Sequence, residues 1–92
     1  MILVGALMLV AQAQSLPACV GVATQSRYVP FGYNHIVILK SGCTAPQVCK
    51  VSTDVNPEVQ TVDLPPGQTV EVMTYMGAAA STFQAKVTCK AR

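Results

Sequence analysis

Four cysteines are the residues of this chain whose chemistry is most easily stated. Cys19, Cys43, Cys49 and Cys89 can form two disulfides, in three possible pairings, or they can bind a zinc ion. Zinc is disfavoured because the Cys-x-x-Cys spacing typical of zinc sites is absent. We expect Cys43 joined to Cys49 across a short turn, and Cys19 joined to Cys89 between the first and last strands.

Two patterns would support catalysis or copper binding, and both are incomplete. A catalytic triad would need His35, the only histidine, as its base, but nothing in the sequence places a nucleophile beside an orienting acid. Met73 and Met76 could join His35 around copper, yet a blue-copper site needs two histidines and a thiolate. We therefore expect a histidine bonded by backbone or water, no enzymatic activity and no cofactor.

Asp54, Asn56 and Glu58 are spaced like part of a calcium-binding loop. The glycine and the distal acid of such a loop are absent, and Pro57 interrupts it. The favoured interpretation is a turn, because Asp and Asn side chains bond nearby backbone N–H groups.

Tyr28, Phe31 and Tyr33 form the aromatic cluster of the chain, which has no tryptophan. Aromatic rings on a loop can stack on sugars or peptides. Packing against the core is the simpler use for these three rings, since Phe31 could close one end of a small domain.

The N-terminus is an uncharged apolar stretch that ends in Ala11-Gln12-Ala13. Small residues at these positions suit signal peptidase, so we expect a signal peptide over 1–13 and one disulfide-linked domain over 14–92. No Lys or Arg precedes the stretch, which leaves open a start further upstream. A buried N-terminal element is the alternative; a membrane span would need roughly 20 apolar residues. Lipidation at Cys19 is disfavoured because it would leave an odd number of cysteines.

The rest of the chain shows the two-residue periodicity of β-strands. In 81–90 apolar residues alternate with polar ones, and the stretch 36–39 is apolar throughout, as in a strand covered on both faces. Further strands are expected at 19–24, 51–55, 59–64 and 69–73, with a tight turn at Pro65-Pro66-Gly67. The expected fold is a small all-β antiparallel sandwich of about six short strands, immunoglobulin-like or cupredoxin-like, held by disulfides.

Four segments resemble a group of small exported bacterial proteins of unknown function. They are Tyr33-Asn34-His35-Ile36-Val37, Ser41-Gly42-Cys43, Cys49-Lys50-Val51-Ser52-Thr53-Asp54-Val55-Asn56-Pro57 and Pro66-Gly67-Gln68-Thr69-Val70-Glu71-Val72. The resemblance implies export and a bacterial source, and it implies no functional residue.

Six basic residues against four acidic ones, spread along the chain, do not indicate nucleic-acid binding. The sequence predicts a secreted or periplasmic interaction module without catalytic activity, whose partner is an unknown protein or glycan. The candidate recognition surface comprises Tyr28, Phe31, Tyr33, Asp54, Asn56 and Glu58. The alternative is an inhibitor of a secreted hydrolase, which would present the Cys43–Cys49 loop as a pre-ordered segment.

The processing prediction is that the exported protein begins at Gln14, because Ala11 and Ala13 satisfy the peptidase. Intact-mass measurement of exported protein checks it. A lipid-modified N-terminal Cys19 would contradict it.

Overall fold

The computed structural model describes residues 16–92, so the signal-peptide prediction over 1–13 and the cleavage before Gln14 lie outside the described residues. This part of the chain is built of β-strands joined by turns and loops. The six strands are β1 (Val20–Val29), β2 (Gly32–Ser41), β3 (Gln47–Thr53), β4 (Gln60–Leu64), β5 (Thr69–Ala78) and β6 (Ala85–Ala91).

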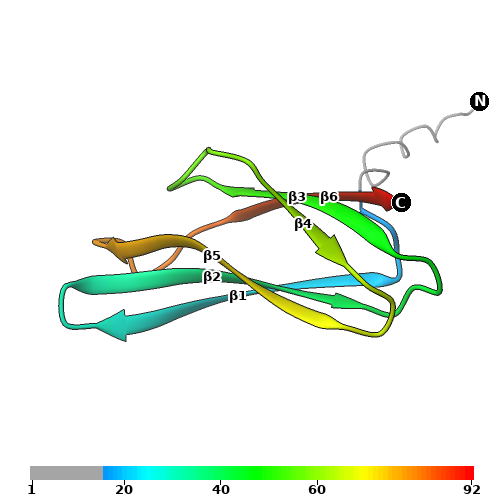
Figure 1. Ribbon diagram of the computed structural model, residues 1–92. Helices are drawn as coiled ribbons and strands as arrows, with labels where there is room; N and C mark the ends of the chain where they lie inside the picture. Colours follow the sequence, from blue (N-terminus) through cyan, green and yellow to red (C-terminus); the bar gives the residue numbers. More distant parts are fainter. Residues whose placement is uncertain (1–15) are drawn as a thin grey trace, which may run out of the picture.

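The strands form two antiparallel three-stranded sheets, in the orders β1-β2-β5 and β4-β3-β6. The sheets lie face to face, and the β1–β2 hairpin and the end of β5 extend beyond the other sheet (Figure 1). The expected six-stranded antiparallel sandwich is confirmed. The strand order matches the immunoglobulin-like arrangement, with β1, β2 and β5 in one sheet and β3 and β6 neighbours in the other.

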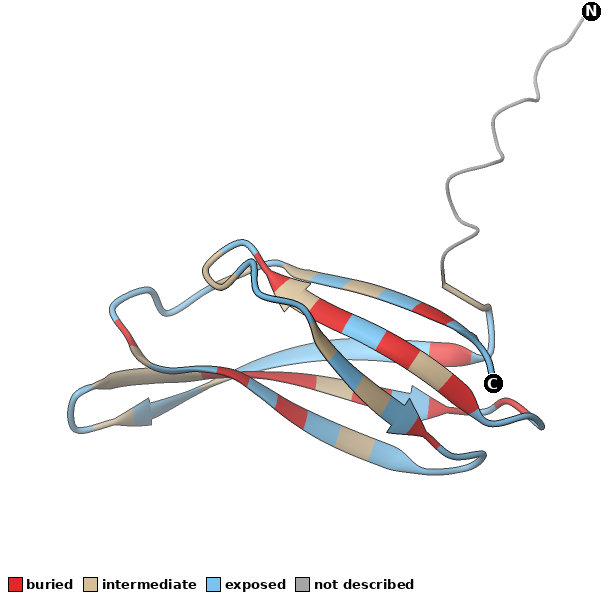
Figure 2. Ribbon diagram, turned by 45° about the horizontal axis from the view of Figure 1, so that its top comes forward, coloured by how far each residue is buried: buried red, intermediate tan, exposed pale blue. Residues whose placement is uncertain are grey.

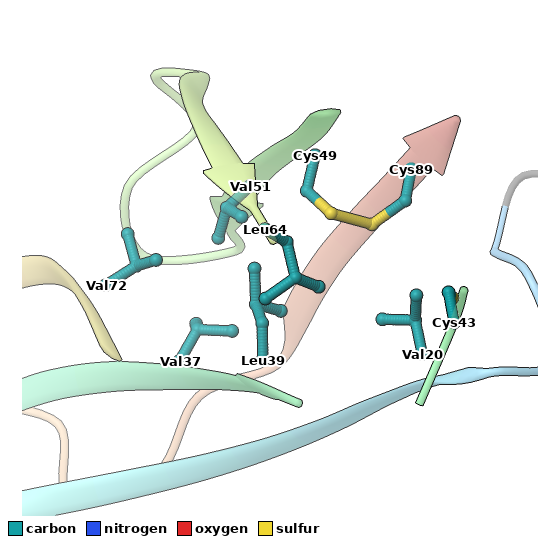
Figure 3. Packing of buried hydrophobic residues seen from close by; sticks show 9 residues of the cluster. All are labelled: Val20, Val37, Leu39, Cys43, Cys49, Val51, Leu64, Val72 and Cys89. Atoms are coloured by element: carbon teal, nitrogen blue, oxygen red, sulfur yellow. A yellow bond between two sulfur atoms is a disulfide. The ribbon is translucent and has the colours of Figure 1, made fainter. Parts of the chain in front are cut away.

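The core lies between the sheets and is made by alternate residues of each strand. In β2 the inward residues are Val37 and Leu39, and in β3 they are Cys49 and Val51, all without exposed surface. Figure 2 shows this alternation as bands along β3, whereas β1 is exposed over most of its length. The cluster, drawn in Figure 3, comprises Val20, Val37, Leu39, Cys43, Cys49, Val51, Leu64, Val72 and Cys89.

An ion pair lies across the outer face of β2 beside the stretch 36–39, which is apolar throughout. Ile36 is the neighbour of inward-facing Val37, so its side chain points to the outer face of the sheet. It lies outside the core cluster and is nevertheless buried. Arg27 of β1 and Glu71 of β5 form an ion pair of 3.1 Å on either side of β2. Arg27 lies opposite Asn34 and Glu71 lies opposite Ile38, so the two side chains cross β2 at the level of Ile36.

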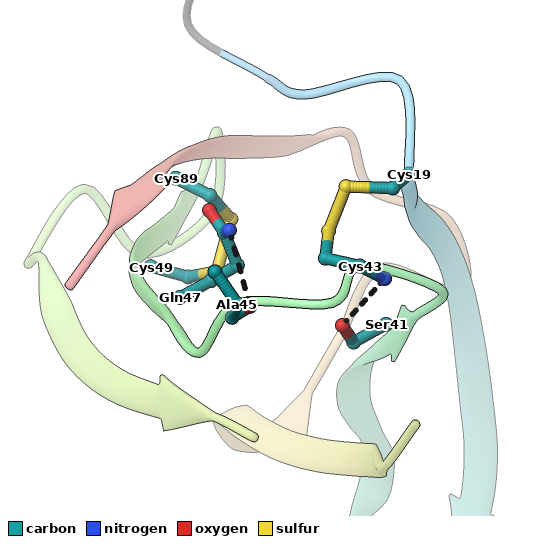
Figure 4. The surroundings of a disulfide bond; sticks show 7 residues. All are labelled: Cys19, Ser41, Cys43, Ala45, Gln47, Cys49 and Cys89. Atoms are coloured by element: carbon teal, nitrogen blue, oxygen red, sulfur yellow. Dashed lines mark hydrogen bonds between the residues drawn. A yellow bond between two sulfur atoms is a disulfide. The ribbon is translucent and has the colours of Figure 1, made fainter. Parts of the chain in front are cut away.

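The expected disulfide pairing is wrong: the bonds are Cys19–Cys43 and Cys49–Cys89 (Figure 4). The segment from Cys43 to Cys49 is not a hairpin turn, because it carries the chain from one sheet to the other. Its two cysteines therefore meet different partners. Cys43 lies beside Cys19, whose carbonyl oxygen accepts a 2.8 Å hydrogen bond from the Gly42 N–H. Cys49 lies opposite Cys89 in neighbouring strands, with 4.1 Å between the Cα atoms.

Several strand boundaries also differ from the expectation: β3 spans Gln47–Thr53 rather than 51–55, and β5 continues beyond Met73 to Ala78. The first strand runs on from Thr24 to Val29 and forms a long hairpin with β2. The last strand begins at Ala85 rather than Ser81, so Phe83 precedes it. Phe83 nevertheless packs against the core, as its alternation with Val87 and Cys89 indicated. The tight turn is confirmed, since Gln68 N–H donates to the Pro65 carbonyl.

We predict that the Cys49–Cys89 bond contributes more stability than Cys19–Cys43. The two bonds close loops with sequence separations of 40 and 24 residues, which correspond to about 3.9 and about 3.4 kcal/mol in the chain-entropy model. Cys49 and Cys89 are also both buried, whereas Cys19 is exposed. Urea unfolding of the Cys49→Ala/Cys89→Ala and Cys19→Ala/Cys43→Ala variants checks this order. Equal losses, or a Cys43–Cys49 peptide in a non-reducing map, would contradict it.

Candidate functional site

The tip of the β1–β2 hairpin is a tight turn whose side chains are exposed. Val29 pairs with Gly32, so Pro30 and Phe31 alone make the turn. Proline fixes its own φ near the value that the second position of a β-turn requires. Gly32 follows at φ 144°, and a Cβ there would lie 2.6 Å from the Ala78 carbonyl oxygen, so this position requires glycine.

The aromatic residues of this hairpin are exposed rather than packed in the core, so the expectation of core packing is wrong for Tyr28 and Phe31. Their exposed fractions are 74% and 71%, and Met76 of β5, at 68%, is similarly exposed. Tyr33 is half-buried and contacts Tyr28 edge to face, with 5.6 Å between ring centroids. We call Tyr28, Phe31, Tyr33 and Met76 the hairpin tip.

The backbone of β5 fixes the position of the Phe31 ring. Gly77 has φ 71°, and a Cβ there would lie 2.7 Å from the Phe31 ring, so the ring occupies the space that the absent side chain leaves. The Gly77 N–H donates to Oδ1 of Asn34 at 3.1 Å, which ties β5 to β2 at this level. Phe31 is therefore exposed on one side and supported on the other.

The second part of the predicted surface, the β3–β4 loop, is used to join the two sheets. The Asn56 Nδ2 donates to the Thr74 carbonyl at 2.6 Å, and its Oδ1 accepts a 3.2 Å bond from the Glu58 N–H. The Asp54 Oδ1 accepts a 2.8 Å bond from the Gln84 N–H. The turn interpretation is thus confirmed for Asn56, which bonds the nearby Glu58 N–H, whereas Asp54 bonds the distant Gln84 N–H instead. Of the three predicted residues, Glu58 is the one whose side chain makes no hydrogen bond within residues 16–92.

His35 is buried and one of its ring nitrogens is bonded by the backbone, as expected, whereas its Nδ1 is buried without a hydrogen-bond partner within residues 16–92. It has no exposed surface, its Nε2 lies 2.7 Å from the Ala80 carbonyl oxygen, and its ring stacks on Phe83 at 4.3 Å. This contact attaches the segment between β5 and β6 to the sheet.

Two further features bear on the possible chemistry of the site. Within residues 16–92, no three His, Cys, Asp or Glu side chains are grouped so as to hold a metal ion. The same part of the chain has no helix of the length and apolarity that crossing a membrane requires.

The fold brings together three lysines that are spread along the sequence. Lys50 of β3 and Lys86 and Lys90 of β6 are exposed and alternate with inward-facing residues, so they share the outer face of their sheet. Asp63 of the neighbouring β4 is paired with Arg92 at 2.9 Å. Sequence order alone could not group these lysines, because the strands that carry them pair only in the folded sheet.

We predict that Asn56→Ala destabilises the fold by about 1–2 kcal/mol, because it leaves the Thr74 carbonyl without its donor. Glu58→Ala, two residues away on the same loop, is the matched control and should change stability by less than about 0.5 kcal/mol. Urea unfolding of both variants checks this. Equal effects would mean that Asn56 is not structural.

Comparisons of the chain with protein-family models, with curated proteins and with solved structures find no match.

Proposed function

We propose that this protein is an exported, non-enzymatic interaction module that binds a protein partner through the hairpin tip. The observation that carries the proposal is the exposure of Tyr28, Phe31 and Met76 at one end of a disulfide-linked scaffold. Large apolar side chains gathered at the surface of a small domain are typical of interaction sites.

The geometry supports recognition because the tip is ordered before it binds. Gly77 supports the Phe31 ring, and Tyr33 holds the Tyr28 ring. A side chain that is already placed loses less conformational entropy on binding. Tyrosine and other large rings are also frequent among the residues that dominate binding energy.

A polypeptide suits the tip better than a glycan. Glycan sites combine an aromatic platform with several polar groups that fix orientation. Asn34, which precedes Tyr33, is already engaged by the Gly77 N–H, and Met76 adds a flexible apolar surface that adapts to protein partners.

The proposal also includes the compartment of the protein, which we infer to be oxidising. Disulfides form and persist in oxidising compartments, and Cys19–Cys43 and Cys49–Cys89 join all four cysteines. Together with the apolar leader and the resemblance to small exported bacterial proteins, the bonds support secretion or a periplasmic location. A Cys19 sulfur engaged with Cys43 supports export without a lipid anchor.

The hydrolase-inhibitor alternative loses the feature on which it depended. No bond joins Cys43 to Cys49, so the segment between them is not a closed loop. It runs between the two disulfides and joins the sheets (Figure 4).

We predict that Phe31→Ala weakens partner binding by about 2 kcal/mol or more while leaving the thermal melt nearly unchanged. Val59→Ala is the matched control, because Val59 is 56% exposed but belongs to the β3–β4 loop and is not one of the hairpin-tip residues. Phe83→Ala should instead cost about 3 kcal/mol of stability, since its ring stacks on buried His35. Calorimetry and partner binding measured on the same preparations separate the three.

The proposal fails if Phe31→Ala destabilises the fold as much as Phe83→Ala, or if Val59→Ala weakens binding equally. Glycan-array binding that depends on Phe31, with no protein captured, would replace the protein partner by a glycan.

A further inference from the structure

The two open sides of the sandwich differ. On one side, between β4 and β5, side chains bridge the sheets: the Gln60 Nε2 donates to the Met73 carbonyl at 3.2 Å, and Asn56 donates to Thr74. On the other side, none of the hydrogen bonds within residues 16–92 joins β1 to β6. Both β1 and β6 are edge strands of their sheets.

The backbone of β6 presents a defined set of groups to this side. The 4.1 Å Cα–Cα distance marks Cys49 and Cys89 as a non-hydrogen-bonded pair of the ladder. Two hydrogen bonds at the ends of the β3–β6 ladder agree with this assignment: the Arg92 N–H donates to the Pro46 carbonyl, and the Asp54 N–H donates to the Gln84 carbonyl. They show that the even-numbered residues of β3 and β6 form the hydrogen-bonded pairs. The N–H and C=O groups of Ala85, Val87 and Cys89 therefore point away from β3, toward the open edge.

The surface along this opening is apolar near Val22 and is lined mostly by hydroxyl side chains near Thr24. Val22 of β1 faces inward and is 37% exposed, and Ala85 and Val87 of β6 are half-buried against the core. A groove of about 320 Å³ lies between β1 and the segment that leads into β6. It is lined by Thr24, Ser26, Ser81, Thr82 and Phe83.

The outer side of the same edge is basic. Lys86 and Lys90 alternate with the inward residues of β6, and Lys50 lies on the next strand. Residues directly opposite each other on paired strands share a face and interact. A strand added to β6 would thus place one set of side chains against the apolar opening and the other beside the lysines.

We propose that the free edge of β6 captures an extended segment of a partner protein that alternates apolar with acidic residues. Its backbone would bond to Ala85, Val87 and Cys89, its apolar side chains would pack near Val22, and its carboxylates would lie beside Lys86. Strand addition to a sheet edge is an established mode of peptide recognition, and seven-stranded immunoglobulin-like domains carry a further strand at this place. This site does not depend on the hairpin tip.

The test uses a synthetic peptide with the length of β6, seven residues, that alternates valine with glutamate. A peptide with lysine in place of each glutamate is the control. The valine–glutamate peptide should bind, and binding should protect the Val87 and Cys89 amide protons from solvent exchange. Binding without protection at these two amides would overturn the proposal, as would equal binding of both peptides.

Two proline variants separate this edge from any other. Val87→Pro removes an N–H that the β3–β6 ladder does not use, and should weaken binding about tenfold or more. Thr61→Pro is the matched control on the other edge strand, β4, where by the same alternation the Thr61 N–H also points outward. It should leave binding unchanged. Equal losses in the two variants would contradict a site at β6.

A charge reversal covers the case in which Val87→Pro does not fold. Lys86→Glu, at an exposed position, should reduce the preference for the valine–glutamate peptide without reversing it, because Lys50 and Lys90 remain; an unchanged preference overturns the proposal. The native protein could instead self-associate with its Val87 amide proton protected, while the Val87→Pro variant stays monomeric. That result would make a second copy of the chain the occupant of the β6 edge and would also overturn the proposal. Phe31→Ala should bind the peptide normally, which separates this site from the hairpin tip.

Discussion

The unequal strand lengths of the two sheets decide which residues are scaffold and which are exposed. The strands β1, β2 and β5 have 10 residues each, whereas β3, β4 and β6 have 7, 5 and 7. At about 3.3 Å per residue, the longer sheet extends about 10 Å further than the shorter one. The core can form only where the sheets overlap, so the hairpin tip lies beyond it.

The two disulfides stabilise the overlapping part. Cys49–Cys89 joins β3 to β6 within the core, and Cys19–Cys43 joins the start of β1 to the segment that follows β2. A domain of this size buries too little apolar surface to gain much stability from packing alone. The cross-links supply this stability although residues 16–92 cover neither the hairpin tip nor the β6 edge.

The sequence predicted what depends on local pattern. The alternation that ends at Cys89 placed β6 and its inward face, and the apolar stretch 36–39 indicated a central strand covered on both sides. Local sequence pattern could not predict features that depend on pairing between distant segments. Cys43 and Cys49 are close in sequence, but the chain changes sheets between them. The exposure of Tyr28 and Phe31 likewise follows from how far one sheet extends beyond the other, which no local pattern records.

Site-specific photo-cross-linking in the producing cell tests the central claim, recognition through the hairpin tip, most directly. A photoreactive phenylalanine analogue would replace Phe31 in one variant and Thr61, exposed on the outer face of the other sheet, in a second. The account predicts one discrete cross-linked protein from position 31 and none from position 61. The same product from both positions, or none from position 31 while the native protein still binds its partner, would contradict it.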